Sequence, residues 1–207
     1  MRGWICVPMI TLCLLLCGCG GTGETVSEAE AARQPYQNMT GCAMEAEVTC
    51  GADPETLLTF TLRCDYVPEG ESTVEVLSPE TAAGIKALVD GETMRLSYED
   101  LVLNAGTLSS EEISPAACLP RLMSALRNGW LLEENEETLD DVPCLRLSLD
   151  ETGENGGKIV STLWLRQEDG TPLRGEIAVD GEIILQARFT EFTFGDIISD
   201  QMPDSSG

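Results

Sequence analysis

The stretch Cys42-Ala43-Met44-Glu45-Ala46-Glu47-Val48-Thr49-Cys50 decides the fold of this chain. Its apolar residues alternate with more polar ones, and a period of two is typical of a strand with one buried face. Residues 58–66 alternate in the same way, with Phe60 and Leu62 among the apolar positions. Because Gly51-Ala52-Asp53-Pro54-Glu55 between them is typical of a turn, the two stretches predict a β-hairpin.

Alternating segments recur along the chain, separated by turn residues. Asp90-Gly91 and Asp180-Gly181 each predict a tight hairpin. A bulge near Thr190-Glu191 would bring the phenylalanines at 192 and 194 onto the apolar face of the last strand. Residues 133–141 are acidic, and we expect them to form a loop. The further strands are expected at 72–77, 85–89, 94–98, 101–103, 144–149, 159–165, 173–179 and 183–194.

Two helices are expected. Ser27 with Glu30 three residues later fits a capping box, and Pro35 would end or kink the short helix that follows. The second helix is predicted by an apolar stripe at i, i+3, i+4 and i+7, starting at Leu119. Gly129 is well placed to end that helix in a left-handed conformation. The stripe consists of Leu119, Leu122, Met123 and Leu126.

The N-terminus has the pattern of an export signal. One positive charge, Arg2, precedes an apolar segment that ends in Leu16-Cys17-Gly18-Cys19. A cysteine directly after Leu-x-Gly resembles the bacterial lipobox, in which the thiol receives a diacylglycerol and the peptide is cut before it. The resemblance implies lipid attachment at Cys19 and a protein tethered to the outer face of the cell membrane; the alternative is an ordinary signal peptide.

The expected organisation follows from these segments. Residues 1–18 are a signal peptide, and residues 19–35 hold the lipidated cysteine, a flexible tether and a short helix. Residues 36–198 form a single domain, and residues 199–207 a disordered tail.

The charge balance restricts the partners. The chain has 36 acidic and 12 basic residues and a net charge of −24. Such a charge argues against a nucleic-acid partner, which needs a basic surface, and against lying flat on anionic lipid. Solubility is the simplest reading of this charge.

Five cysteines remain in the predicted domain: Cys42, Cys50, Cys64, Cys118 and Cys144. None makes a CxxC pair, and the chain has no histidine, so we expect no metal site. If the first hairpin is centred on Asp53, Cys42 and Cys64 face each other on its apolar side. They would then form a disulfide, or stay buried as free thiols that act as small hydrophobic groups.

The sequence gives enzymatic readings little support. Without histidine, neither a Ser-His-Asp nor a Cys-His arrangement is available, and the chain has no phosphate-binding or dinucleotide-binding motif. The acidic pairs at 133–134, 140–141 and 168–169 are adjacent in expected loops and read as solvated charge. We therefore expect no catalytic residue and no cofactor, and keep an unrecognised hydrolase as the third hypothesis.

The predicted elements favour an α+β fold in which a strongly curved antiparallel sheet buries its apolar face. The lipobox, the curled sheet and a short helix between its halves together resemble the outer-membrane lipoprotein carrier superfamily. That group includes the carrier LolA, its receptor LolB and mycobacterial lipid-binding lipoproteins. Segments 77–80, 96–100 and 163–165 are similar to small lipoproteins of clostridial and related gut bacteria, such as the clostridial germination lipoprotein, which partners a cortex amidase.

The resemblance covers about residues 36–198 and implies an unclosed, LolA-like barrel with a helical lid or plug on its concave face. It implies a non-catalytic lipoprotein that binds a lipid or an acylated ligand, for example through palmitate-type chains. The alternative is a lipoprotein that docks or stabilises an exported cell-envelope or spore-cortex enzyme. The candidate cavity lining, which would otherwise be plain core, is Met44, Val48, Phe60, Leu62, Val74, Val76, Leu122 and Leu126.

Overall fold

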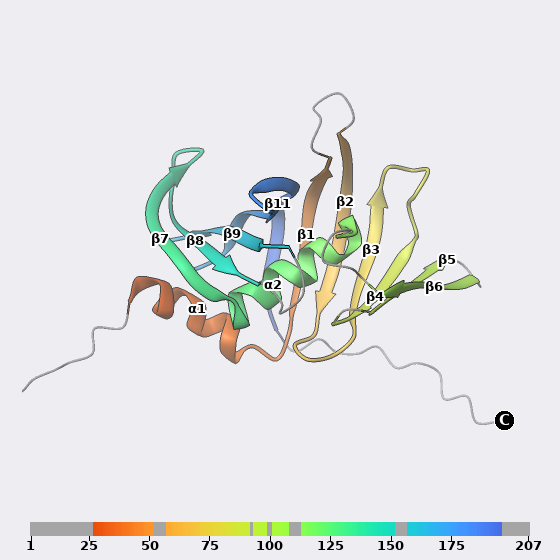
Figure 1. Ribbon diagram of the computed structural model, residues 1–207, viewed down its shortest axis with the longest axis horizontal. Helices are drawn as coiled ribbons and strands as arrows, with labels where there is room; N and C mark the ends of the chain where they lie inside the picture. The colour runs from red at the N-terminus through yellow and green to blue at the C-terminus, as the bar shows by residue number, and fades with distance from the viewer. Residues whose placement is uncertain are drawn as a thin grey trace, which may run out of the picture.

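The computed structural model describes residues 27–51, 57–91, 93–98, 101–107, 113–151 and 157–195. Within these residues, eleven strands form one antiparallel sheet, in the order β6-β5-β4-β3-β2-β1-β11-β10-β9-β8-β7 (Figure 1). The strands are β1 (Cys42–Cys50), β2 (Leu58–Tyr66), β3 (Ser72–Ser78), β4 (Lys86–Asp90), β5 (Thr93–Tyr98), β6 (Leu101–Thr107), β7 (Trp130–Leu139), β8 (Val142–Asp150), β9 (Ile159–Arg166), β10 (Pro172–Val179) and β11 (Glu182–Phe194).

The chain builds the sheet from its middle outward. β1 to β6 follow one another to one edge, the chain then crosses the sheet, and β7 to β11 return to pair with β1. The crossing segment consists of a short 3₁₀ helix, Pro115–Ala117, and helix α2 (Cys118–Asn128). Figure 1 shows the sheet curving around α2, with β6 and β7 at its two open edges. The expected α+β fold with an unclosed, curved antiparallel sheet is confirmed.

The first hairpin forms as predicted, with a register that differs by two residues. Alternate residues of β1 are buried, as expected for a strand with one apolar face. Cys42 lies opposite Tyr66, whereas Cys64 lies opposite Met44. The hairpin is thus centred one residue later than Asp53, and the expected direct opposition of Cys42 and Cys64 is wrong. The structure has both as free, buried thiols.

The bulge expected in the last strand is present at Thr190. Glu45 pairs with Glu191 and Ala46 with Phe189, so no residue of β1 lies opposite Thr190 in the register, and its hydroxyl donates to the Glu45 carbonyl at 3.1 Å. The extra residue turns Phe192 and Phe194 toward Tyr36, whose ring centroid lies 5.9 Å and 5.0 Å from theirs. Such spacings are typical of tilted and edge-to-face aromatic packing.

The acidic stretch 133–141 is not a loop. Most of it belongs to β7, an edge strand that pairs with β8 alone and is largely exposed on both faces. Because neither face is buried, the stretch lacks the alternation by which a strand is recognised. The turn to β8 is made by Asp140 and Asp141 with φ of 50° and 65°, values that a two-residue hairpin of this type requires.

The remaining expected elements fall close to their predicted places. The hairpins at Asp90-Gly91 and Asp180-Gly181 are present. β6 is longer than expected, since it continues to Thr107. The signal segment with Cys19, the loop 52–56, residues 152–156 and the tail 199–207 lie outside the described residues.

Helix α1 (Glu28–Asn38) begins as predicted, with the Glu30 backbone N–H donating to the Ser27 Oγ at 3.1 Å. It does not end at Pro35, however, but continues to Asn38. The turn after Pro35 is held by tertiary contacts, because Tyr36 is fully buried and its hydroxyl donates to the Gly170 carbonyl at 2.5 Å. Tertiary packing here outweighs the backbone hydrogen bond that proline removes.

Candidate functional site

Helix α2 occupies the concave face of the sheet. It contacts β2 on one side of the sheet centre and β8 to β11 on the other. The predicted apolar stripe of Leu119, Leu122, Met123 and Leu126 is fully buried against these strands. The helix is therefore a plug that fills the curve of the sheet.

The structure brings the eight predicted lining residues together around this plug. Seven of them are less than 10% exposed, and Phe60, half-buried, packs against the same cluster. The closeness of the packing shows at Gly175, where a built Cβ would lie 2.5 Å from Leu122 Cδ1. With α2 in this position, the predicted lining is the hydrophobic core of the protein.

The C-terminal end of α2 is also closely packed. Gly129 has φ of −62°, so the left-handed conformation predicted for it is wrong. Glycine fits this position because there is no space for a side chain. A Cβ there would lie 2.7 Å from the Ala125 carbonyl oxygen and 3.0 Å from Leu149 Cβ. Both distances are shorter than a comfortable van der Waals contact.

Two arginines join α1 to α2. The Arg33 guanidinium donates to the Leu126 carbonyl at 2.8 Å and to the Gly129 carbonyl at 2.8 Å. The Arg127 guanidinium donates to the Tyr36 carbonyl at 2.8 Å and to the Gln37 carbonyl at 3.1 Å. Sequence reasoning missed this pair, because an arginine within a helix gives no signal of a carbonyl it reaches about 90 residues away.

A polar cluster lies at the other end of α2. The Arg121 Nε is 3.6 Å from Glu151 Oε2, is buried, and makes no hydrogen bond among the described residues. The Ser161 hydroxyl donates to Glu151 Oε1. Burial raises the pKa of Glu151 above the ordinary glutamate range, although Arg121 acts in the opposite direction.

Three cysteines lie in the core, Cys42 and Cys64 on the sheet and Cys118 at the start of α2. Burial raises the pKa of Cys42 to about 12 and also raises the pKa values of Cys64 and Cys118. Thiols in such an environment stay protonated and react slowly, since the thiolate is the reactive form. Among the described residues, no group of three or more His, Cys, Asp or Glu side chains is placed to hold a metal ion.

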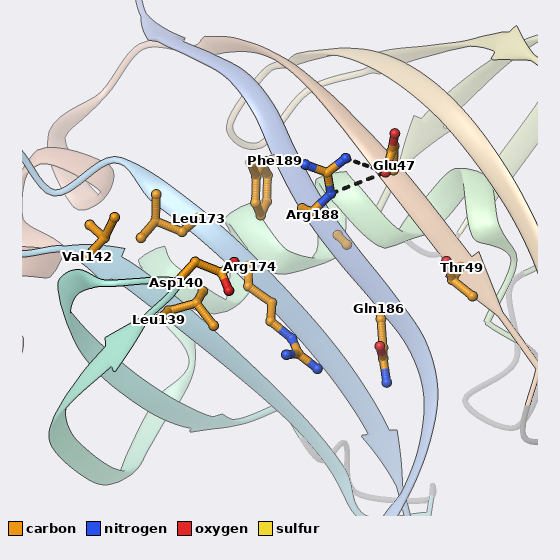
Figure 2. A pocket seen from close by; sticks show the side chains of 11 residues that line it. Glu47, Thr49, Leu139, Asp140, Val142, Leu173, Arg174, Gln186, Arg188 and Phe189 are labelled. Atoms are coloured by element: carbon orange, nitrogen blue, oxygen red, sulfur yellow. Dashed lines mark hydrogen bonds and ion pairs between the residues drawn. The ribbon is translucent and has the colours of Figure 1, made fainter.

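A hollow of about 460 Å³ lies over β1, β10, β11 and the β7–β8 turn (Figure 2). Arg188 donates two hydrogen bonds to Glu47 Oε2, at 2.6 Å and 3.2 Å, and Arg174 is paired with Glu176. Figure 2 shows Arg174 lying between the β7–β8 turn and β11. Because carboxylates match both guanidinium groups, the hollow has no marked preference for an anion.

A larger cleft separates α1 from the ends of β7, β8 and β9; we call it the α1 cleft. Its volume is about 590 Å³. Its apolar lining comes from Ala31, Ala32, Pro35, Leu145 and Leu165, and its acidic lining from Glu28, Glu136, Glu168 and Asp169. Arg166 also lines the cleft and is paired with Asp169 at 2.9 Å, which leaves the other three carboxylates as the acidic lining.

No protein-family model matches the sequence, and the comparison with curated proteins gives no match either. Solved structures do match. A Vibrio parahaemolyticus domain assigned as an outer-membrane lipoprotein-sorting protein is 11% identical, with a TM-score of 0.50 over 84% of this chain and 93% of that one. A LolA superfamily protein from Nitrosomonas europaea is 12% identical, with a TM-score of 0.49 over 82% and 93% of the two chains.

Lipoprotein LppX from Mycobacterium tuberculosis is 13% identical, with a TM-score of 0.44 over 81% of this chain and 93% of that one. At these identities the likenesses describe the fold, which is the LolA-like curved sheet that the sequence predicted. Among the described helices, none is long and apolar enough to cross a membrane.

Proposed function

We propose that this protein is a non-catalytic, extracytoplasmic lipoprotein, anchored through Cys19, whose concave face takes up an acyl chain when α2 moves away. The observation that carries the proposal is the apolar stripe of α2 seated in the curve of the sheet. An acyl chain offers the same kind of apolar surface as that stripe, so it can take the place of the stripe against the sheet.

The sheet supplies a suitable trough. Ala46, Val48 and Val74 are buried on its concave side with small side chains, and Gly175 has none, which leaves room once the helix is displaced. The solved structures that share the fold include a lipoprotein-sorting domain and a lipoprotein, and this supports the proposal.

Mass spectrometry of an organic extract from the purified protein tests lipid binding. A bound lipid at about one per chain is expected. An extract without lipid, together with no uptake of a fluorescent fatty acid, would contradict it. A matched pair of variants, Ala46→Trp on the concave face and Thr49→Trp on the outer face, separates uptake in the trough from adsorption elsewhere. Only the first should reduce uptake.

The anchor is tested separately. Cys19→Ala should release the protein from membranes and abolish labelling by a fatty-acid probe, whereas Cys17→Ala should leave both unchanged. Label retained after Cys19→Ala would contradict lipidation at this residue.

A second function is favoured by one specific observation. β7 is an open edge with two large apolar side chains in solvent, Trp130 at 77% and Leu132 at 46% exposure. Unpaired edges can accept a strand from another chain. A protein that docks an exported envelope or spore-cortex enzyme, like the clostridial germination lipoprotein, would use such an edge. Cross-linking from residue 132 in the native membrane, followed by identification of the product, tests this function.

A further inference from the structure

We propose that the free edge of β7 binds an extended, cationic segment of a partner protein as a twelfth strand, with its inward side chains over the α1 cleft. The inference rests on the docking function and specifies the chemistry of its partner. β7 is ten residues long and about 33 Å in extent, enough for a peptide to pair along its length.

The glutamates of β7 determine which strands can pair with it. Glu134 lies opposite Leu147 and Glu136 opposite Leu145. Both leucines belong to the buried core, so both glutamates project on the concave side of the sheet. Within the described residues neither glutamate has an ion-pair partner, whereas Glu133 on the outer side is paired with Arg146 at 3.1 Å.

Inward-pointing charges on an edge strand protect it from unwanted pairing. Two β7 edges brought together would place these glutamates near one another, so a second copy is disfavoured. A neutral strand would leave them unpaired in a partly covered site. A strand with Lys or Arg at alternate positions neutralises them instead, so the same feature that excludes other strands selects a cationic one.

The α1 cleft extends this preference beyond the strand itself. Glu136 lines it, together with Glu28 of α1 and Glu168 of the β9–β10 turn. These carboxylates come from three different elements and surround a floor of alanine, proline and leucine side chains. Cationic side chains with long apolar stems match such a surface, because the stem covers the floor while the charged end reaches the rim.

The test uses a fluorescent decapeptide of alternating Lys and Thr, titrated against the purified full chain by fluorescence anisotropy. We expect saturable binding that weakens with added salt, and no binding of a Glu-Thr decapeptide. Glu134→Gln with Glu136→Gln should weaken binding about tenfold. The control, Glu182→Gln with Glu191→Gln, changes the net charge equally on exposed residues of β11 and should have little effect.

Backbone pairing is tested with a Lys-Thr peptide that is N-methylated at alternate residues, so that one of its edges cannot donate hydrogen bonds. This peptide should bind much more weakly. Equal binding by both peptides, or an equal loss in the β11 control, would show general attraction to an acidic protein and overturn the inference. So would a dimer of the protein that the Lys-Thr peptide does not disrupt. Peptide binding without any cross-linked partner would overturn the docking function only.

Discussion

Arg33 and Arg127 each cap the helix that carries the other. Arg33 lies in α1 and donates to carbonyls at the C-terminal end of α2, while Arg127 lies in α2 and donates to carbonyls at the C-terminal end of α1. The last carbonyls of a helix have no partner within it, and positive charge is favourable at that end. Burial lowers the pKa of Arg33, which still remains charged.

Removing one cap should therefore destabilise both helices. Arg33→Ala is expected to lower the free energy of unfolding by about 2–3 kcal/mol, the order expected for charged hydrogen bonds to partly buried carbonyls. A double-mutant cycle with Arg127→Ala, measured by urea unfolding, should give a sizeable coupling energy. Arg63→Ala, which breaks the exposed ion pair with Glu45, is the control and should change little. Strict additivity in the cycle would show that the two caps act independently.

Space between α2 and the sheet is tested at Gly175. Gly175→Ala should lower the free energy of unfolding by about 1–3 kcal/mol, because the new methyl group overlaps Leu122. Gly195→Ala is the control, since nothing lies within 4 Å of a Cβ built there. Leu122→Ala should rescue part of the loss at Gly175. Thermal melts compare the wild type, Gly175→Ala, Gly195→Ala and the double variant Gly175→Ala with Leu122→Ala. An unchanged melting temperature for Gly175→Ala would mean that α2 is loosely packed against the sheet.

Glu151 should make stability depend on pH. Because its folded-state pKa is raised, the protonated side chain contributes stability that is present at low pH and lost as the pH rises through that value. Gln mimics the protonated form, so the stability of the wild type relative to Glu151→Gln should fall as the pH rises above the ordinary glutamate range. Glu182→Gln, at the exposed first residue of β11, corrects for the overall charge. A difference that does not vary with pH would contradict the assignment.

The thiols should differ in reactivity. Cys50, half-buried, is expected to be alkylated by iodoacetamide before Cys42, Cys64 and Cys118, which are buried and protonated. Peptide mapping by mass spectrometry follows each site, and labelling in urea gives the maximal extent. Failure of Cys42 and Cys64 to react in urea until a reductant is added would establish the disulfide as the alternative state.

The sequence predicts this fold best where a strand has one buried face. β1 and the bulge at Thr190 follow from alternation, because burial on one side leaves a period of two in the residues. β7 could not be found in this way, since both of its faces are exposed and its pairing with β8 depends on backbone hydrogen bonds. The two-residue register error at Cys42 arises because the loop centre, not the alternation, fixes the register.

The residues of the candidate site could be predicted from the sequence, but whether they line an open cavity could not. Periodicity places Val48, Leu62 and Leu122 on apolar faces, but it does not tell whether a helix fills the space between them. That is decided by close contacts such as the one at Gly175. The carbonyl caps of Arg33 and the cluster around Glu151 depend on residues far apart in the chain, and no local pattern marks them.

A single residue, Gly129, separates the end of α2 at Asn128 from the start of β7 at Trp130. The C-terminal end of the helix is also held by Arg33, so in the proposed uptake of an acyl chain α2 would turn about Gly129. The moving end would be the start of α2, next to the 3₁₀ segment that contacts β1 and β3, and its movement would have to break the Arg121–Glu151 contact. In that proposal the acyl chain would enter the trough beside these strands, at the end of α2 away from α1.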